Sequence, residues 1–357
     1  MAHTVVEMLC DLVRVDSESG NERGFMEYLS SWLAREVGAE CDFDAYGNLI
    51  GRISAKDSKA AAIILAAHGD TVRPGCGIEP RVVDGVVRSS GTTILGADDK
   101  AGIAEIVYAI QTARRRPPVE IVITVGEEVG LHGARHLDLG KLRAKRAFIV
   151  DGEKLEEVIT GGPTHINLDI TVRGRAAHAG LEPEKGISAI RVAASAIARM
   201  PEGRIDHETT ANVGIIEGGL IRNGVPETVK IKAECRSLTH EKALAQARAM
   251  RSAFEHAATE FGATVEIEET IEYEARSIDP DCAVVQCAME AVRAAGLVPV
   301  AKSITGGTDA LILANRGLEA VVLGLGGENA HTTEECIAVS ALEKGAEILR
   351  HLLENLV

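Results

Sequence analysis

The sequence predicts an α/β fold into which a smaller α+β domain is inserted. Apolar, strand-like runs alternate with helical stretches in residues 1–163 and again in residues 276–357, which is typical of a largely parallel sheet covered by helices. Strand-like segments in residues 164–275 instead alternate apolar and polar side chains with a period of two, as half-exposed antiparallel strands do. A chain of 357 residues also exceeds what one hydrophobic core usually holds, so we expect two domains with these boundaries.

The composition limits the class of protein and its partners. With 46% hydrophobic and 25% charged residues, the chain has the composition of a soluble globular protein. Its net charge of −15 argues against nucleic acid or an anionic membrane as a partner. The apolar stretch at residues 5–15 is interrupted by Glu7, Asp11 and Arg14, so it predicts neither a signal peptide nor a membrane span, and we expect a cytoplasmic protein. Seven scattered cysteines without a CxxC spacing indicate reduced thiols rather than disulfides.

Two amphipathic helices are expected at the amino end of the chain. Thr4 and Glu7 form the capping-box pattern that opens the first helix, and Gly38 marks the end of the second. Three strand-like runs follow, at residues 41–44, 49–54 and 60–67. The last of them, AAAIILAA, predicts a strand buried on both faces, and it ends directly before His68 and Asp70.

Acidic side chains follow the next strand-like runs. Residues 81–88 carry an Asp84-Gly85 turn, which predicts a hairpin. The acidic residues come after residues 92–95 (Asp98, Asp99), residues 119–125 (Glu127, Glu128) and residues 146–150 (Asp151). Carboxylates at junctions between strands and helices lie where α/β folds place their functional sites, at the carboxyl ends of strands.

The inserted segment has the order of a split βαβ arrangement, which is ferredoxin-like. Its predicted elements are a strand at 165–173, a helix at 186–200, strands at 211–216 and 228–236, a helix at 241–261 and a strand at 264–272. The α/β pattern then resumes with a helix, a strand at 298–303, a glycine turn at Gly306-Gly307, a strand at 320–325 and a helix from about 339. The small domain is therefore an insertion into the larger one.

The strand ends supply the residue types of a metal site. Two imidazoles, His68 and His331, accompany the acidic residues, whereas no thiolate pattern does, and this combination suits Zn²⁺, Mn²⁺ or Co²⁺. If Asp98 bridges two ions about 3.5 Å apart, each ion needs one histidine and one further carboxylate, and the sequence supplies that number.

Two local spacings suggest further roles. His68 and Asp70 are two residues apart on an extended segment, so their side chains point to the same side, and Asp70 can hold the second imidazole nitrogen of His68. The consecutive residues Glu127 and Glu128 point in different directions, so one can bind metal while the other acts as a base. The residues alone do not decide between the two.

Five ordered motifs, AHGDTV, LGADDKAG, GEEVG, VDG and AHTTEE, resemble the motif series of the peptidase T branch of the dizinc exopeptidases. That family also includes glutamate carboxypeptidase, the aminoacylases and succinyl-diaminopimelate desuccinylase. The resemblance covers nearly the whole chain and implies a zinc-exopeptidase α/β catalytic domain with an inserted lid and dimerisation domain. It also implies a cis peptide bond between Asp98 and Asp99.

The resemblance implies a role for each residue of the candidate site. His68, Asp98 and Asp151 would hold one zinc ion, and Asp98, Glu128 and His331 would hold the other. Glu127 would be the general base, and Asp70 would orient His68.

Matches in the inserted segment concern the substrate. His178 in GRAAHAG resembles a lid histidine that, in relatives, crosses from the partner subunit to stabilise the reacting carbonyl, which implies a homodimer through this domain. Asn223 and Arg236 resemble a lid pair that binds polar or carboxylate groups of the substrate. Gly306 and Gly307 match a loop whose backbone amides approach the substrate.

The implied function is the hydrolysis of short peptides by a di- or tripeptide aminopeptidase, with a water molecule activated by two metal ions. The same metal core also serves carboxypeptidases and N-acyl amino acid amidohydrolases, and these remain alternatives. A third alternative, an inactive metal-binding homologue, is disfavoured because every position of the core motifs is filled.

Overall fold

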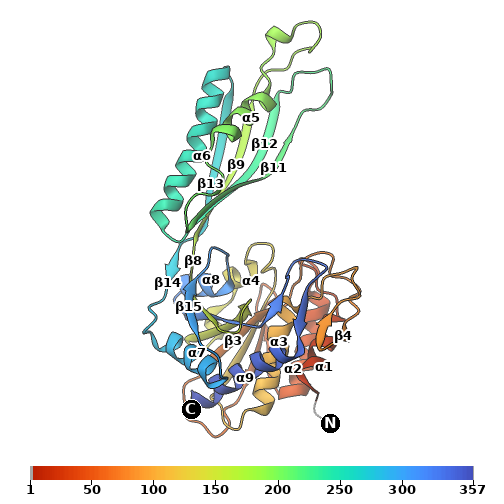
Figure 1. Ribbon diagram of the computed structural model, residues 1–357, viewed down its shortest axis with the longest axis vertical. Helices are drawn as coiled ribbons and strands as arrows, with labels where there is room; N and C mark the ends of the chain where they lie inside the picture. Colours follow the sequence, from red (N-terminus) through yellow and green to blue (C-terminus); the bar gives the residue numbers. More distant parts are fainter. Residues whose placement is uncertain (1–2, 357) are drawn as a thin grey trace. The chain divides into compact units, whose positions relative to one another are not determined.

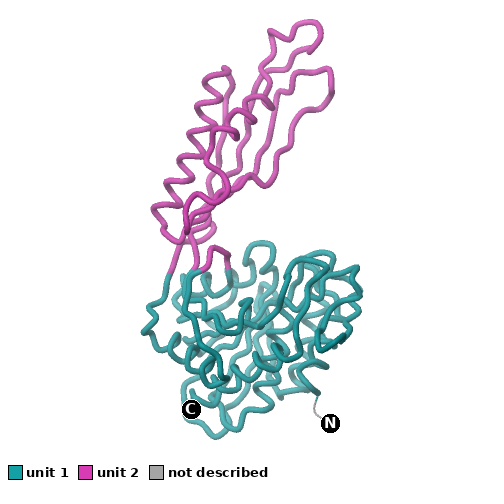
Figure 2. Tube along the Cα trace, in the orientation of Figure 1, with its two compact units in different colours: residues 1–161, 277–303, 308–357 teal, residues 162–276, 304–307 magenta. Residues whose placement is uncertain are grey.

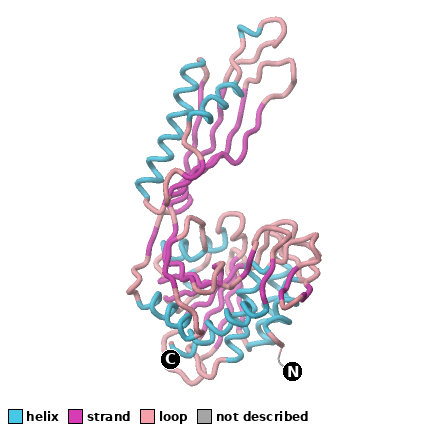
Figure 3. Tube along the Cα trace, viewed as in Figure 1, coloured by secondary structure: helices cyan, strands magenta, loops and turns pink. Residues whose placement is uncertain are grey.

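The computed structural model describes residues 3–356, which fold into two compact units (Figure 1, Figure 2). The first unit comprises the described residues of Met1–Gly161, Ser277–Ser303 and Thr308–Val357. The second unit comprises Gly162–Arg276 and Ile304–Gly307. Figure 3 shows that each unit combines strands with helices. The predicted fold class, an α/β domain with an α+β insertion, is confirmed.

A nine-stranded sheet forms the centre of the first unit, with the order β1-β2-β6-β3-β7-β16-β8-β14 and with β15 also paired to β8. The strands are β1 (Glu40–Phe43), β2 (Leu49–Ile53), β3 (Ile63–His68), β6 (Val119–Thr124), β7 (Arg146–Gly152), β8 (Glu157–Gly162), β14 (Arg276–Ser277), β15 (Val300–Ser303) and β16 (Glu319–Gly324). β3 runs parallel to β6 and β7, and β16 runs parallel to β7. The carboxyl ends of these four strands therefore meet at one edge of the sheet.

The apolar runs of the sequence explain why these strands lie at the centre. Every residue of β3 and of β6 is buried, as predicted for a strand covered on both faces. β3 begins at Ile63, however, and residues 60–62 of the predicted run precede it and are exposed or partly exposed. The core contains almost no aromatic side chains apart from Phe25, Trp32 and Phe148, and it is built from leucine, isoleucine, valine and alanine. The sheet thus provides a rigid base for the loops that follow its strands.

Seven α-helices accompany the sheet in the described part of the first unit: α1 (Val5–Val13), α2 (Arg23–Val37), α3 (Ala97–Thr112), α4 (His132–His136), α7 (Ala283–Ala294), α8 (Asp309–Asn315) and α9 (Val339–Asn355). The predicted capping box opens α1, because Thr4 Oγ1 accepts from the Glu7 amide and Glu7 Oε2 accepts from the Thr4 amide. α3 packs closely on α9 at Gly345, where a Cβ atom would lie 2.3 Å from the Glu105 carboxyl group. None of the described helices has the length and apolar character needed to cross a membrane.

A separate four-stranded sheet lies beside these helices and carries one of the predicted ligands. Its order is β17-β18-β5-β4, with β17 at Gly327–Glu328, β18 at Cys336–Ala338, β5 at Val86–Arg88 and β4 at Arg81–Val83. β4 and β5 form the predicted hairpin, and its turn residues Asp84 and Gly85 both have positive φ. The connection between β17 and β18 contains His331.

The second unit is an antiparallel sheet packed against two helices. The sheet order is β10-β11-β12-β9-β13, with β9 at Thr164–Arg173, β10 at Gly203–Arg204, β11 at Thr209–Gly218, β12 at Thr228–Ser237 and β13 at Thr264–Tyr273. The helices are α5 (Ala189–Arg199) and α6 (His240–Phe261), and their apolar faces meet alternate residues of β9 and β12. β9 alternates buried and more exposed residues, as the period of two in its sequence predicts.

Candidate metal centre

The carboxyl edge of the central sheet delivers most of the predicted ligands. His68 is the last residue of β3, Asp151 is the sixth residue of β7, and the turn that contains Glu128 follows β6. Asp98 lies at the amino end of α3, where Asp98 and Asp99 have non-helical backbone angles and are joined by a cis peptide bond. His331 comes from the smaller sheet, between β17 and β18.

Asp98 lies between the two imidazoles. Its Oδ1 is 3.1 Å from His68 Nε2, and its Oδ2 is 3.4 Å from His331 Nε2. His68 Nε2 also lies 3.7 Å from Asp151 Oδ1, and His331 Nε2 lies 2.8 Å from Glu128 Oε1. Each oxygen of Asp98 therefore faces a different histidine, and each histidine faces a second carboxylate. A ligand shared between two metal ions would need such a two-sided arrangement.

The charges of the cluster fit divalent cations. Burial raises the pKa of Asp151 well above its usual range, and the nearby Asp98 carboxylate raises it further. Hydrogen bonds to Asp98 and Glu128 raise the pKa of His331 to about 10. The cluster thus holds more negative charge than its own imidazoles offset, and its donors are imidazole nitrogens and carboxylate oxygens, which suit zinc, manganese or cobalt. The residues fit one or two divalent ions.

Asp99 also lies in the cluster, but its contacts indicate a different role. Its side chain is fully buried, and its Oδ2 accepts a hydrogen bond from the backbone amide of His68 at 3.0 Å. Asp99 and Gly102 are also so close that a Cβ atom on Gly102 would lie 2.3 Å from Asp99 Oδ1. Asp99 therefore ties the amino end of α3 to the end of β3.

Asp70 contacts both His68 and the turn after β6. His68 Nδ1 lies 3.0 Å from the backbone carbonyl oxygen of Asp70 and 3.5 Å from its carboxylate Oδ1. The two carboxylate oxygens accept hydrogen bonds from the amides of Glu127 and Glu128, at 2.9 Å and 3.2 Å, and Oδ2 also accepts from Ser19 Oγ at 2.7 Å. The Asp70 carboxylate thus holds the main chain of the Glu127–Glu128 turn, in addition to lying near the imidazole.

Glu127 and Glu128 diverge, as their adjacency predicts. Glu128 contacts His331, whereas the Glu127 carboxyl group has no hydrogen-bond partner among the described residues. Burial raises the pKa of Glu127 well above its usual range; His68 acts in the opposite direction, and Asp151 and Asp309 add to the increase. A carboxyl group that faces the cluster without contacting either histidine is suited to exchange protons.

The residues predicted to bind substrate all lie in the second unit, which includes Ile304–Gly307. His178 and Asn223 lie on adjacent segments, because His178 forms a bridge with Gly224 and the Ala179 amide donates to the Asn223 carbonyl at 2.9 Å. Gly306 and Gly307 form a bend directly before α8.

Arg236 lies near the opposite end of β12 from this pair. Its guanidinium binds both carboxylate oxygens of Glu234, and Glu234 also contacts His165 at 2.8 Å. Arg236 lies eight positions after Thr228, the first residue of β12, which is a distance of roughly 26 Å at 3.3 Å per residue. Asn223 precedes Thr228, so the structure does not bring Asn223 and Arg236 together within one chain.

Three residues near the cluster were missed by the sequence analysis: the partly buried Ser19 and the buried Asp309 and Glu335. Ser19 binds Asp70, and Thr124 Oγ1 donates to Asp309 Oδ2 at 2.5 Å. Burial raises the pKa of Asp309 to about 6, although the Thr124 hydrogen bond opposes this. Glu335 contacts the turn that carries Asp98. Only Glu335 lies in one of the quoted motifs, at the end of AHTTEE, and nothing in the motif indicated its partner.

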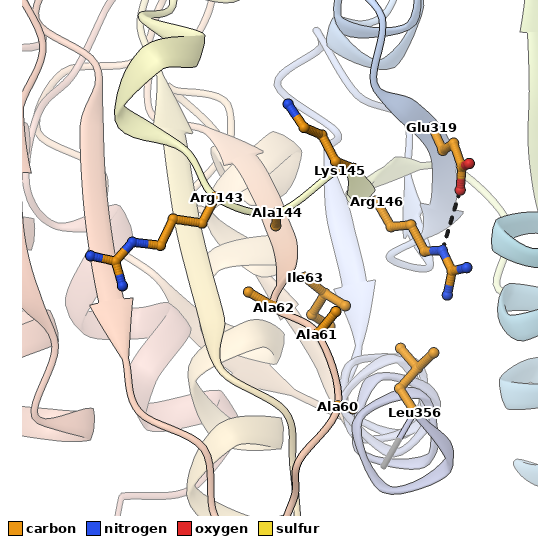
Figure 4. Close-up of a pocket in the computed structure, with 10 residues that line it drawn as sticks. All are labelled: Ala60, Ala61, Ala62, Ile63, Arg143, Ala144, Lys145, Arg146, Glu319 and Leu356. Carbon is orange, nitrogen blue, oxygen red and sulfur yellow. Dashed lines mark hydrogen bonds and ion pairs between the residues drawn. The ribbon is translucent and has the colours of Figure 1, made fainter.

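Two hollows differ in their relation to the cluster. A small cavity of about 40 Å³ is bounded by Asp98, Asp151 and Glu335, and it adjoins the predicted ligands. A larger one, of about 330 Å³, lies at the amino ends of β3 and β7, where it is lined by alanines, Ile63, Leu356 and charged residues (Figure 4). In Figure 4, Arg146 pairs with Glu319 at the rim of the larger hollow. The predicted ligands therefore adjoin the smaller cavity.

Known proteins resemble this chain over most of its length. The sequence profile of Peptidase family M20/M25/M40 matches residues 64–355. Peptidase T of Clostridium novyi (strain NT) is 30% identical over 75% of this chain and 68% of that protein. The crystal structure of aminopeptidase PepT from Bacillus cereus ATCC 10987 has a TM-score of 0.88 and 40% identity, and it covers 99% of this chain and 98% of that one. A tripeptidase from Staphylococcus aureus superposes with a TM-score of 0.93 at 32% identity, over 99% of this chain and 97% of that one.

Proposed function

Since the chain belongs to Peptidase family M20/M25/M40, we propose that it is a peptidase T-like metallopeptidase that removes the amino-terminal residue of short peptides. The observation that carries this proposal is the position of Asp98, which faces His68 with one oxygen and His331 with the other. Similarity to a peptidase T, an aminopeptidase and a tripeptidase favours a di- or tripeptide substrate over a carboxypeptidase or N-acyl hydrolase activity.

Two groups of side chains would hold the metal ions. We assign His68, Asp98 and Asp151 to one ion, and Asp98, Glu128 and His331 to the other. The distances between their side chains support this division. The donor set suits Zn²⁺ and also admits Mn²⁺ or Co²⁺. Such ions lower the pKa of bound water and polarise the carbonyl group that is attacked.

The remaining residues perform the proton transfers and fix the geometry. Glu127 accepts a proton from the attacking water and returns it to the leaving amine, which requires a carboxylate that is not occupied by a histidine. The Asp70 carboxylate keeps Glu127 in place through the Glu127 amide. The Asp70 carbonyl holds the ring of His68 through Nδ1, so that Nε2 faces Asp98. His178 stabilises the charge that develops on the scissile carbonyl oxygen, and the amides of Gly306 and Gly307 contact the substrate.

A pair of tripeptides distinguishes the proposed reaction from its alternatives. We expect a tripeptide with a free amino group to lose its first residue, and its N-acetylated form to resist cleavage, because an aminopeptidase binds the free amine. Mass spectrometry of the products, with zinc or cobalt supplied, measures both the rate and the bond cleaved. Cleavage of the acetylated peptide alone would show instead an acylase or a carboxypeptidase, according to whether acetate or the last residue is released.

We also propose that the protein is a homodimer in which the second unit supplies residues to the partner's site. Asn223 precedes the start of β12, and Arg236 lies near its end, so roughly 26 Å or more separates them. This distance is several times the length of a dipeptide, so the Asn223 and Arg236 of one chain cannot both contact one short substrate. The outer edge of β11 supports an association of two copies: β10 pairs only with its first residues, and Ile215 and Ile216 are half exposed.

The seven free cysteines suit a reducing compartment, and we place the dimer in the cytoplasm.

Mixing two inactive variants tests whether His178 acts on the partner's site. If it does, a heterodimer of His178→Ala and Glu127→Gln subunits has one site with both defects and one intact site. We therefore expect up to half of the wild-type activity per heterodimer after subunit exchange, measured against each variant alone. No recovery, with exchange verified by differently tagged subunits, would mean that His178 serves its own chain.

A further inference from the structure

Glu335 connects the loop between β17 and β18 that carries His331 (the His331 loop, residues 329–335) with the turn that carries Asp98 (the Asp98 turn, residues 96–99). It lies four residues after His331, directly before β18, and its side chain is 2% exposed. Its Oε2 accepts a hydrogen bond from the Gly96 amide at 2.7 Å, and its Oε1 accepts one from the Asp98 amide at 3.0 Å. One carboxylate from the His331 loop therefore binds two amides of the Asp98 turn.

The Asp98 turn needs this acceptor because of its backbone conformation. Gly96 has a left-handed conformation with φ of 71°, and no side chain caps the start of α3 locally. The first amides of a helix have no partner within the helix and must find one elsewhere. In this protein the acceptor comes from a residue 237 positions along the chain from Asp98.

The main chain of Glu335 is hydrogen-bonded within the His331 loop. The Glu335 amide donates to the Thr332 carbonyl at 3.1 Å, and Thr332 Oγ1 donates to the Asn329 carbonyl at 2.8 Å. Both Asn329 and His331 have positive φ, so the loop is tightly turned around the ligand. The position of the imidazole relative to Asp98 is therefore fixed through Glu335.

We propose that Glu335 is a positioning residue that fixes the position of Asp98 relative to His331. It thereby determines how tightly Asp98, Glu128 and His331 bind their metal ion, which is called the second ion below. The inference rests on the proposed function, because it assumes that these residues hold metal. Glu335 is not itself a ligand, since each of its oxygens is engaged by a backbone amide. Its effect on the reaction passes through Asp98 and His331.

The variant Glu335→Gln tests the proposal with little change of shape. Glutamine offers one acceptor oxygen, so its amide nitrogen must face one of the two backbone N–H groups. We expect the affinity for the second ion to fall about 10–100-fold, the range seen when groups that support metal ligands are altered. Competition with a chromophoric chelator and the visible spectrum of the cobalt-loaded protein measure this without reference to activity. For the tripeptide substrate we expect kcat to fall more than KM changes.

Glu120 provides a matched control in the same unit. Its carboxylate is also buried, at 4% exposure, and accepts hydrogen bonds from the Arg143 and Ala144 amides at 3.0 Å. It lies near the amino end of β6, away from the ligand-bearing ends of the strands. We expect Glu120→Gln to lower the melting temperature as Glu335→Gln does but to leave the affinity for both ions unchanged.

The outcomes separate this inference from the proposed function. If wild-type protein binds two ions and Glu335→Gln binds both with unchanged affinity, the positioning role is overturned and the proposed function stands. If the wild type itself binds no divalent ion, the proposed function fails first. Should Glu335→Gln not fold, Glu335→Asp keeps two acceptor oxygens but withdraws them by one methylene. Because the shorter side chain moves its oxygens away from the Gly96 and Asp98 amides, Glu335→Asp should also bind the second ion more weakly. An unchanged affinity of this variant for the second ion would contradict the proposal.

Discussion

Glu127→Gln is expected to keep both metal ions and to lose turnover by about 10²–10⁴-fold, the usual contribution of a positioned general base. Glutamine has the shape of glutamate but cannot accept a proton at neutral pH. The contact with Asp70 survives, because it is made by the Glu127 amide rather than by its side chain. The measurement is kcat for a tripeptide, together with the metal content of the same sample by elemental analysis.

The neighbouring residue supplies the control for this experiment. Glu128 contacts His331 and belongs to the proposed ligands, so Glu128→Gln should weaken metal binding and lose activity for that reason. Excess metal should therefore restore part of the activity of Glu128→Gln and none of the activity of Glu127→Gln. A metal-loaded Glu127→Gln enzyme with wild-type turnover is incompatible with the assignment of the base.

Much of the fold was predictable because its signals are local. The apolar run before His68 identifies a buried strand, and the Thr4 and Glu7 pair identifies the start of α1. Alternation with a period of two in β9 likewise identifies a strand with one buried face. Each of these patterns depends on residues within one element, so it can be recognised without knowledge of the partners of that element.

The candidate ligands were predictable for a related reason. His68, Asp151 and the Glu127–Glu128 pair come at or just after the ends of strands, and parallel neighbours bring those ends together. The residues alone did not indicate which of the two glutamates faces His331; only the resemblance to the dizinc exopeptidases implied that it is Glu128. That depends on the turn after β6, whose amides are held by the Asp70 carboxylate, 57 and 58 residues earlier.

The contacts that connect the ligand loops could not be predicted, because they join residues far apart in the chain. Asp99 binds the amide of His68, Asp70 binds the amides of the Glu127–Glu128 turn, and Glu335 binds the amide of Asp98. In each case a carboxylate from one ligand loop holds the main chain of another. The loops therefore support one another through their main chains.

Asp98 is the side chain on which both halves of the proposed centre depend. Its two oxygens face His68 and His331, so its removal leaves each proposed ion with only one histidine and one carboxylate. Loss of a direct, shared ligand should weaken binding of each ion by more than the roughly 10–100-fold seen for supporting groups. Its main-chain contact with Glu335 is made by the amide and persists in a substituted protein.

Asp98→Ala is therefore expected to lose both metal ions on dialysis and to have no measurable peptidase activity. Asp98→Asn is the graded comparison, because it keeps one oxygen and removes the negative charge; it should retain less metal than the wild type and more than Asp98→Ala. Metal content per chain, measured after equal dialysis, orders the three proteins. Circular dichroism of the three proteins should be alike, because each substitution leaves the main-chain contact of residue 98 with Glu335 in place. Two ions per chain in Asp98→Ala would show that Asp98 does not bridge them, whatever the activity of that variant.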